Sequence, residues 1–261
     1  MEIRFPRKPR VLCLHGFRTS AEILRKEIQQ WPEPVLRKLD LVFIDAPFLA
    51  SGRSGFESLV DPPNFEWFQS NKGFTEYYNF DECLAYLEDY MMKHGPFDGL
   101  LGFSQGAVLS SAFPGMQSEG TALTRIPMIK FLILISGAMF GGMKYGAPKQ
   151  AANAYSSPIK LPSLHIIGEK DQIQKEPGIE LLQSFEDPFV IYHSNGHVVP
   201  RLGASEVSQG LGGLLCFRFF LAFGKSRAEL RVDSGNFRDD KDEETMLHFI
   251  QKIEKLQLQE G

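Results

Sequence analysis

The chain has 261 residues, with 28 Lys and Arg against 32 Asp and Glu, which gives a formal net charge of −4 at pH 7. A nucleic-acid-binding protein needs surplus positive charge to displace phosphate counterions, so this balance argues against one. Apolar residues make up 43% and charged residues 23%, which is typical of a globular protein and excludes wholesale disorder.

The cysteines and the N-terminal residues indicate an intracellular location. Cys13, Cys83 and Cys216 are too few for a disulfide framework, their odd number suits a reducing environment, and their spacing matches no metal site. The N-terminal residues lack the apolar core of a secretory signal. The longest apolar stretch, Leu211–Phe223, is interrupted and too short to span a bilayer. We therefore expect a soluble intracellular protein without a transmembrane span.

Short apolar runs alternate with segments of helical period, a pattern that predicts βαβ units and a parallel sheet. The runs are nearly continuous in apolar residues, as expected for strands buried on both faces. The predicted strands are Val11–Leu14, Leu41–Ile44, Gly99–Gly102, Phe131–Ile135, Ser163–Ile167 and Phe189–His193.

Helices are predicted between several of these strands. Thr19 and Glu22 have the spacing of a capping box and predict a helix start. A second helix is predicted to open at Asn79 and to end before Gly95. The last covers about residues 242–258, with an apolar stripe made of Met246, Leu247, Ile250, Ile253 and Leu256.

A motif for nucleophilic catalysis lies between a predicted strand and an apolar helical stretch. Gly102–Gly106 has the pattern Gly-x-Ser-x-Gly, and Ala107–Phe113 follows it. This context is typical of a nucleophile elbow, a turn so tight that small residues must flank the serine. Ser104 is therefore the predicted nucleophile. The alternative is a glycine-rich turn whose serine merely caps the helix.

A serine nucleophile needs a base, and the chain offers six histidines. His197 lies in a loop just past the C-terminal end of the last predicted strand, where the sites of open α/β sheets collect. His197 is the predicted base. His193, which ends that strand, is the alternative, although its position is more typical of a structural histidine.

A carboxylate should orient the base and stabilise the imidazolium. Asp171 follows the predicted strand that ends at Ile167, and it is the predicted partner. Glu169 and Asp187 are its rivals. The chain order Ser104, Asp171, His197 is the order of α/β-hydrolases.

The tetrahedral intermediate of such a reaction needs two preorganised N–H donors. One is predicted to be the backbone N–H of Gln105, directly after the nucleophile. The other is predicted to be the N–H of Phe17, in the loop after the first strand. The alternative is that His15 and Gly16 simply form a tight turn before the first helix.

Several motifs together carry a family resemblance: Val11–Phe17, Phe43–Pro47, the pair Trp67 and Phe68, Gly102–Ala107, Ile167–Asp171 and Gly196–Pro200. In this combination they resemble the FSH family of serine hydrolases. The resemblance covers about residues 8–202 and the final helix.

This resemblance implies one α/β-hydrolase domain over residues 8–258, with a mostly parallel central sheet and helices on both faces in a three-layer sandwich. It implies a triad of Ser104, Asp171 and His197. It also implies hydrolysis of small-molecule carboxylic esters with long, straight acyl chains, without a metal or organic cofactor. The implied location is the cytoplasm, with the nucleus as a second compartment.

Residues 48–78 form a long segment rich in Gly, Ser, Pro and aromatic side chains, and long loops of compact domains are usually functional or mobile. Apolar ligands are held by aromatic side chains, so Trp67 and Phe68 are candidate pocket residues for an acyl chain. Met139 and Phe140 are weaker candidates. The alternative for all of these is core or lid packing.

Residues 203–236 depart from the family pattern, in which the chain passes almost directly from the histidine segment to the last helix. We interpret this inserted segment as a translated intron or a gene-model error, because its apolar surface would favour aggregation. The alternative is a lid or an amphipathic membrane-contact segment. In either case it begins six residues after His197.

Three functions remain open from the sequence. The leading one is a serine esterase that works through an acyl-enzyme. The Gly-Phe-Ser-Gln-Gly elbow is shared with acyl-protein thioesterases, so thioesterase or lipase-like activity is an alternative. A ligand receptor on the same scaffold, with no sustained turnover, is the third.

Overall fold

The computed structural model describes residues 7–50, 63–202 and 239–259. At its centre is a six-stranded sheet in the order β10-β9-β8-β7-β1-β2, in which every pair of neighbours is parallel. Its strands are β1 (Arg10–Leu14), β2 (Asp40–Ile44), β7 (Gly99–Phe103), β8 (Phe131–Ile135), β9 (Ser163–Gly168) and β10 (Phe189–His193). All six predicted strands are confirmed, and each boundary lies within one residue of its expected position.

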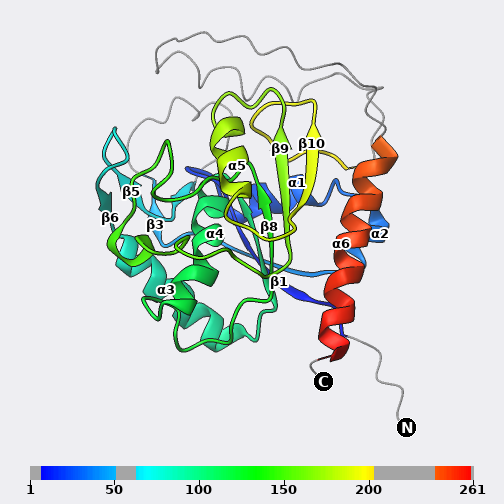
Figure 1. Cartoon of the computed structure of the whole chain (residues 1–261), viewed down its shortest axis with the longest axis horizontal. Helices are drawn as coiled ribbons and strands as arrows, with labels where there is room; N and C mark the ends of the chain where they lie inside the picture. Colours follow the sequence, from blue (N-terminus) through cyan, green and yellow to red (C-terminus); the bar gives the residue numbers. More distant parts are fainter. Residues whose placement is uncertain (1–6, 51–62, 203–238, 260–261) are drawn as a thin grey trace.

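Helices cover both faces of this sheet, which confirms the predicted three-layer α/β class (Figure 1). One face is covered by α3 (Phe80–His94), α4 (Gln105–Ser118) and α5 (Lys175–Leu182), and the other by α1 (Ala21–Ile28), α2 (Glu33–Leu36) and α6 (Asp239–Gln259). Strand β1 separates the two cores because successive side chains point to opposite faces. Leu12 and Leu14 pack into the first core, whereas Val11 and Cys13 pack into the second.

The first helix begins one residue later than the capping-box spacing predicts. The N-cap of α1 is Ser20, whose hydroxyl accepts a hydrogen bond from the N–H of Ile23 at 3.3 Å. Thr19 instead turns back, and its hydroxyl donates to the carbonyl of Gly16 at 2.9 Å. The capping-box prediction is therefore wrong in register, because Thr19 is held by the loop that precedes the helix.

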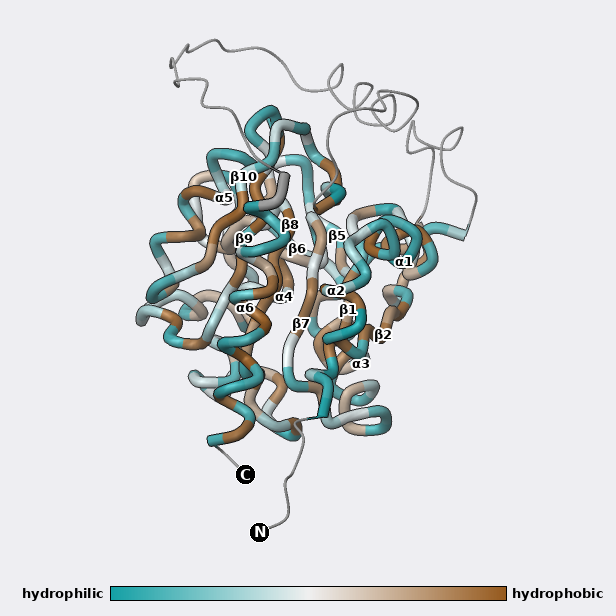
Figure 2. Tube along the Cα trace, turned by 90° about the vertical axis from the view of Figure 1, so that its right-hand side faces the viewer, coloured by the Kyte–Doolittle hydropathy of each residue, from teal (hydrophilic) through white to brown (hydrophobic). Residues whose placement is uncertain are grey.

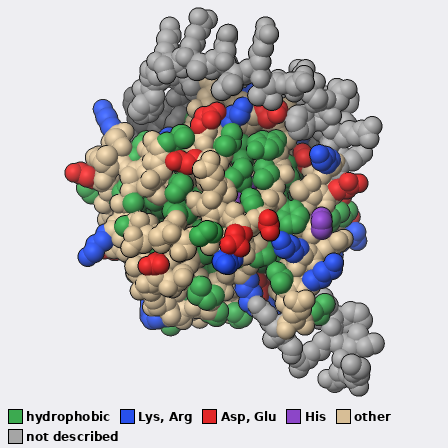
Figure 3. All heavy atoms as spheres, in the orientation of Figure 1, with side chains coloured by type: hydrophobic (Ala, Val, Ile, Leu, Met, Phe, Trp, Pro, Cys, Tyr) green, Lys and Arg blue, Asp and Glu red, His purple; other side chains and the backbone are tan. Residues whose placement is uncertain are grey.

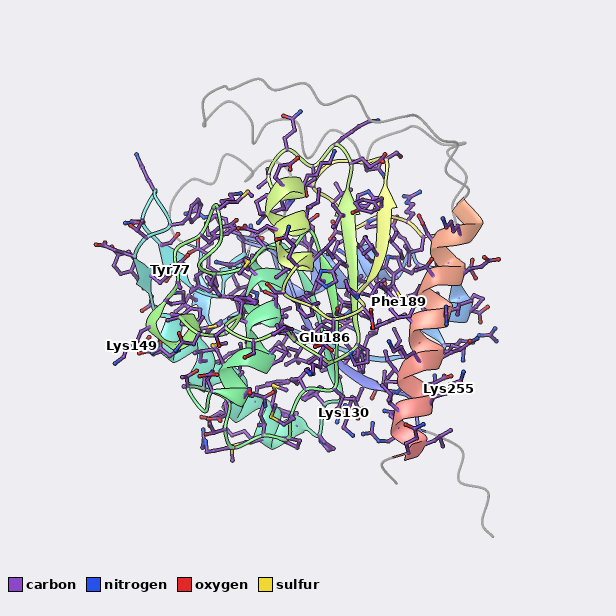
Figure 4. The ribbon with its side chains drawn as sticks, in the orientation of Figure 1. Tyr77, Lys130, Lys149, Glu186, Phe189 and Lys255 are labelled. Atoms are coloured by element: carbon purple, nitrogen blue, oxygen red, sulfur yellow. The ribbon has the colours of Figure 1, made fainter. Side chains whose placement is uncertain are left out.

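Helix α6 lies beside β10 and packs an apolar stripe against the sheet (Figure 1). Brown and teal alternate along it in Figure 2, as expected for a helix with one apolar face. Its buried residues are Met246, Phe249, Ile250 and Ile253. Of the predicted stripe, Leu256 is 39% exposed, and Phe249 was missed. In Figure 4 the ring of Phe189, at the start of β10, lies on the side of α6, and it meets Phe249 with ring centroids 5.5 Å apart.

The long segment between β2 and α3 is more ordered than its composition indicates. Four short strands form two antiparallel pairs: β3 (Phe48–Leu49) with β4 (Phe65–Glu66), and β5 (Gln69–Ser70) with β6 (Tyr77–Tyr78). Residues 51–62, within the same segment, lie outside the described part of the chain, as does the inserted segment 203–236.

Three helical elements were not predicted from the sequence: α2, α5 and the short 3-10 helix Lys149–Ala151. On the face shown in Figure 3, Lys and Arg side chains are interspersed with Asp and Glu side chains. Among the described residues, no helix combines the length and apolar character that crossing a membrane requires.

Candidate active site

The predicted triad and oxyanion residues lie at one edge of the sheet, where its parallel strands end. Phe17 follows β1, Ser104 and Gln105 follow β7, Asp171 follows β9 and His197 follows β10. Because all six strands run in the same direction, these turns meet at the carboxyl edge of the sheet.

Ser104 occupies a strained turn between β7 and α4. Its backbone has φ 51° and ψ −114°, a conformation that non-glycine residues rarely adopt. The turn is held by a hydrogen bond from the N–H of Ser104 to the carbonyl of Ile135 at 3.0 Å. A serine whose strained backbone conformation is held in place by its surroundings is typical of a nucleophile elbow.

The two flanking glycines are required by close packing. A Cβ on Gly102 would lie 2.5 Å from the backbone of Gly106, and a Cβ on Gly106 would lie 2.2 Å from the carbonyl oxygen of Leu14. Both positions therefore exclude any larger residue, and the N-terminus of α4 lies directly against the end of β1.

A chain of two short hydrogen bonds links the three predicted triad residues. The Nε2 atom of His197 is 2.8 Å from the Oγ of Ser104, and its Nδ1 atom is 2.8 Å from an Oδ of Asp171. The carboxylate of Asp171 is buried, whereas the imidazole retains 14% exposure. The imidazole can therefore take the hydroxyl proton of Ser104 while its other nitrogen is held by a carboxylate.

The carboxyl group of Asp171 stays ionised although it is buried. Burial alone would raise its pKa, but the hydrogen bond and charge of His197 and the N–H of Gln174 outweigh burial and lower the pKa to about 2. One oxygen accepts the backbone N–H groups of Ile173 and Gln174, both at 2.9 Å. The same turn leads into α5, which is how the fold fixes the direction of the carboxylate.

A neighbouring loop supports this turn from the outside. The ammonium group of Lys144 donates to the carbonyl of Ile173 at 2.9 Å, and the side-chain amide of Gln174 donates to the hydroxyl of Tyr145 at 2.7 Å. Desolvation lowers the pKa of Lys144 to about 8, and the nearby charge of Asp171 opposes this effect. Sequence reasoning missed these supports, because nothing in the local pattern links residues 144–145 to Asp171.

The rival residues do not occupy the triad positions. His193 ends β10 and is buried, and within the described part of the chain neither of its ring nitrogens has a hydrogen-bond partner. Burial lowers its pKa to about 4. Asp187 is exposed, and Glu169 contributes its backbone N–H to the carbonyl of His193. The geometry thus brings together Ser104, His197 and Asp171.

The two predicted oxyanion donors flank Ser104. The N–H of Gln105 is at the first position of α4, where it has no acceptor within the helix. A Cβ on Gly16 would lie 3.5 Å from the Cβ of Ser104, so the loop that carries Phe17 runs directly past the nucleophile. In the described part of the chain, neither Phe17 nor Gln105 gives its backbone N–H to a protein acceptor.

The candidate pocket residues are mostly in the core. Trp67 is fully buried, Phe68 is 6% exposed and Phe140 is 2% exposed, whereas Met139 is half-buried. Phe68 and Phe140 belong to an aromatic cluster whose ring centroids are 5.4–6.3 Å apart, completed by Tyr77 and Phe80. Core packing, the alternative, therefore describes Phe68 and Phe140, whose rings pack on each other and on the cluster, and Trp67, whose ring packs on His15.

His15 was not expected to have a role beyond its turn. It is fully buried, and desolvation lowers its pKa to about 4, so its ring is neutral near pH 7. Its Nε2 accepts the N–H of Ala46 at 3.0 Å, and its Nδ1 is 2.8 Å from the carbonyl oxygen of Gly16. Since Nε2 is an acceptor, Nδ1 carries the proton and donates to that carbonyl.

Within residues 7–50, 63–202 and 239–259, no group of three or more His, Cys, Asp or Glu side chains is arranged to hold a metal ion.

Comparisons with known proteins find similar sequences among hydrolases and esterases. The sequence profile of a family described as serine hydrolase (FSH1) matches residues 1–208. An esterase of Drosophila melanogaster, CG5412, is 31% identical over 208 residues, which cover 77% of this chain and 71% of that protein. Human esterase OVCA2 is 30% identical over 209 residues, which cover 73% of this chain and 89% of that protein.

A solved structure adds information on the fold. The carboxylesterase from Mesorhizobium loti superposes with a TM-score of 0.51 at 14% identity, over 73% of this chain and 82% of that chain. Identity at this level speaks for the fold alone, and the fold is that of the α/β-hydrolases, as predicted.

Proposed function

The chain belongs to the FSH1 family of serine hydrolases, and from that premise we propose that it is a carboxylesterase that works through an acyl-enzyme on Ser104. The proposal rests on the hydrogen-bonded chain from Ser104 through His197 to Asp171, with both links at 2.8 Å. Such a chain activates a hydroxyl that is otherwise a weak nucleophile.

In the first half of the proposed reaction, the Oγ of Ser104 attacks the ester carbonyl carbon, and its proton passes to the Nε2 of His197. The carbonyl oxygen becomes an oxyanion and accepts hydrogen bonds from the N–H groups of Phe17 and Gln105. Collapse of this intermediate breaks the bond to the alkoxy oxygen, which takes the proton from His197 and leaves as the alcohol.

In the second half, water attacks the acyl-enzyme and gives a proton to His197. The new tetrahedral intermediate releases the carboxylic acid, and the proton returns to Ser104. Asp171 remains ionised throughout and stabilises the imidazolium each time it forms. The reaction consumes one ester and one water and needs no other reactant.

For the substrate, we propose a small-molecule ester with a long, straight acyl chain, encountered in the cytoplasm. Thioester hydrolysis by the same residues is the second candidate, because the attack on the carbonyl carbon is the same and only the leaving atom differs.

Steady-state turnover of p-nitrophenyl esters of graded chain length, beside the matching acyl thioesters, tests this proposal. We expect sustained turnover by the wild type, loss of turnover in Ser104→Ala, and kcat/KM that rises with chain length for the oxygen esters. Higher kcat/KM for the thioesters would support the second candidate. A single turnover or mere binding by folded protein would contradict both and favour a receptor.

A further inference from the structure

Four consecutive residues, Phe65 to Phe68, bond to both segments that carry the proposed oxyanion donors. We call residues 65–68 the clip. Its two central side chains are buried, with Glu66 at 2% exposure and Trp67 at 0%. Buried polar contacts of this kind are costly to break, because the groups left behind have no water to replace the partner.

On one side the clip holds the loop after β1. The backbone N–H of Phe65 donates to the carbonyl of Thr19 at 2.7 Å, and the indole N–H of Trp67 donates to the carbonyl of His15 at 2.8 Å. Glu66 pairs with Arg18, with Nε and Oε1 2.7 Å apart. The indole and imidazole rings of Trp67 and His15 also pack, with centroids 5.1 Å apart.

The clip binds the carbonyls of His15 and Thr19, and the side chains of these two residues share one acceptor. Both the Nδ1 of His15, at 2.8 Å, and the hydroxyl of Thr19, at 2.9 Å, donate to the carbonyl oxygen of Gly16. That oxygen belongs to the same peptide unit as the N–H of Phe17. Because the unit is planar and trans, its C=O and N–H point in opposite directions. Anchoring the oxygen therefore fixes the direction of the Phe17 N–H.

On its other side the clip holds the residue that follows the nucleophile. The side-chain oxygen of Gln105 accepts the backbone N–H of Trp67 at 3.0 Å, and its side-chain nitrogen donates to the carbonyl of Phe68 at 2.8 Å. One amide side chain thus bonds to the backbones of two consecutive residues of the clip. The residue that supplies the second oxyanion donor is bound to the clip that controls the first.

We propose that the clip is a positioning element for the oxyanion hole, and that Trp67 and Thr19 act on catalysis through the Gly16–Phe17 peptide. This role rests on the proposed function, since it requires an oxyanion to stabilise. It replaces substrate contact as the role of Trp67, which is covered on all sides.

The chain provides a matched control for Trp67. The second tryptophan, Trp31, is 3% exposed, and its indole N–H also donates to a backbone carbonyl, that of Pro200, at 2.9 Å. Trp67→Phe and Trp31→Phe therefore remove the same atoms and the same type of hydrogen bond from two buried sites. We expect similar losses of thermal stability.

The catalytic effects of the two variants should differ. With p-nitrophenyl octanoate, we expect Trp67→Phe to lower kcat about tenfold to a hundredfold with KM within about threefold of the wild type, because a misdirected donor weakens transition-state binding alone. We expect Trp31→Phe to keep kcat within about twofold. The inhibition constant of an alkyl trifluoromethyl ketone, whose carbonyl becomes an oxyanion when Ser104 adds to it, should rise in parallel with the fall in kcat/KM.

Thr19 gives a second variant in case Trp67→Phe does not fold. Thr19→Val keeps the shape but removes the hydroxyl that donates to Gly16, whereas Thr19→Ser retains it. We expect the same selective loss of kcat in the valine variant and recovery in the serine variant. Equal activity of Trp67→Phe and Trp31→Phe, or of Thr19→Val and Thr19→Ser, would overturn the clip proposal. A wild type without ester turnover would instead overturn the proposed function.

Discussion

At the residue scale, the central feature is an imidazole held between a hydroxyl and a buried carboxylate. Asp171 accepts two backbone N–H groups on one oxygen and His197 on the other, so its charge is fully partnered despite burial. Its pKa, lowered to about 2, keeps the carboxylate ionised at every pH at which the protein is expected to work. The carboxylate thereby keeps the imidazole in the tautomer protonated on Nδ1, which leaves Nε2 free to accept the proton of Ser104.

Replacing Asp171 by Asn tests this role. The amide has nearly the same shape, but it removes the charge that stabilises the imidazolium and permits the wrong tautomer. We expect kcat to fall by about 10³-fold to 10⁴-fold while the folded structure is retained. Steady-state kinetics measures the fall in kcat, and circular dichroism checks that the variant is folded. His193→Gln is the comparison, since it removes the rival base, and a larger loss of kcat there than in Asp171→Asn would contradict the assignment.

At the element scale, the site depends on how closely the turn before α4 approaches β1. The Cβ that Gly106 lacks would fall 2.2 Å from the carbonyl oxygen of Leu14, a backbone atom that cannot move aside. Gly73, in the turn between β5 and β6, offers the contrast, because its nearest neighbours would be 3.9 Å from a new Cβ.

We therefore expect Gly106→Ala to lower the free energy of unfolding by at least about 2 kcal/mol, because overpacking forces the backbone to shift. Gly73→Ala should change it by less than about 0.5 kcal/mol, as is usual for an open surface position. Urea denaturation of the two variants measures both. Equal stability would mean that α4 is not packed against β1 as described.

The elements of this fold differ in how far the sequence predicts them. The central strands were predictable because burial on both faces leaves continuous apolar runs such as Phe131–Ile135. The cap of α1 was misplaced by one residue, since Thr19 and Ser20 carry equivalent hydroxyls and only the tertiary contact with Gly16 decides between them. Phe249 was missed in α6 because the stripe continues toward β10 and leaves Leu256 at the surface.

In the candidate site, the triad was predictable from the sequence, whereas the contacts that support the oxyanion donors were not. Ser104, Asp171 and His197 each follow a recognisable strand, and parallel strands bring their ends together. The contacts of Trp67 with His15 and Gln105 were not predictable, because they join residues that are 52 and 38 positions apart through backbone atoms. Composition alone makes a buried tryptophan in an aromatic segment look like a ligand contact.

At the scale of the whole molecule, buried histidines make stability depend on pH. Burial lowers the pKa to about 4 for His15, about 3 for His165 and about 4 for His193. Each binds a proton in the unfolded chain at about pH 5 but not in the folded protein. Glu27 acts in the opposite direction, because burial raises its pKa to about 7 and the folded state holds its proton.

Unfolding near pH 5 thus takes up about two protons in net, three from histidines less one from Glu27. We expect the free energy of unfolding to fall by roughly 2 to 3 kcal/mol per unit as the pH decreases from about 6 to about 5. Urea denaturation across this range measures the slope. His165→Asn should reduce the slope by about 1.4 kcal/mol per pH unit, which is the contribution of one proton. A slope of zero or of opposite sign would contradict the burial of these rings.

The assembled nucleophile is the central claim, and labelling by a fluorophosphonate tests it most directly. The probe phosphonylates only a serine whose hydroxyl is activated, with loss of fluoride, and mass spectrometry of proteolytic peptides locates the adduct. We predict labelling of the full-length protein on Ser104, none in Ser104→Ala, and much slower labelling in His197→Ala. Folded wild-type protein that stays unlabelled, or a Ser104→Ala variant that is labelled as fast as the wild type, would contradict the account.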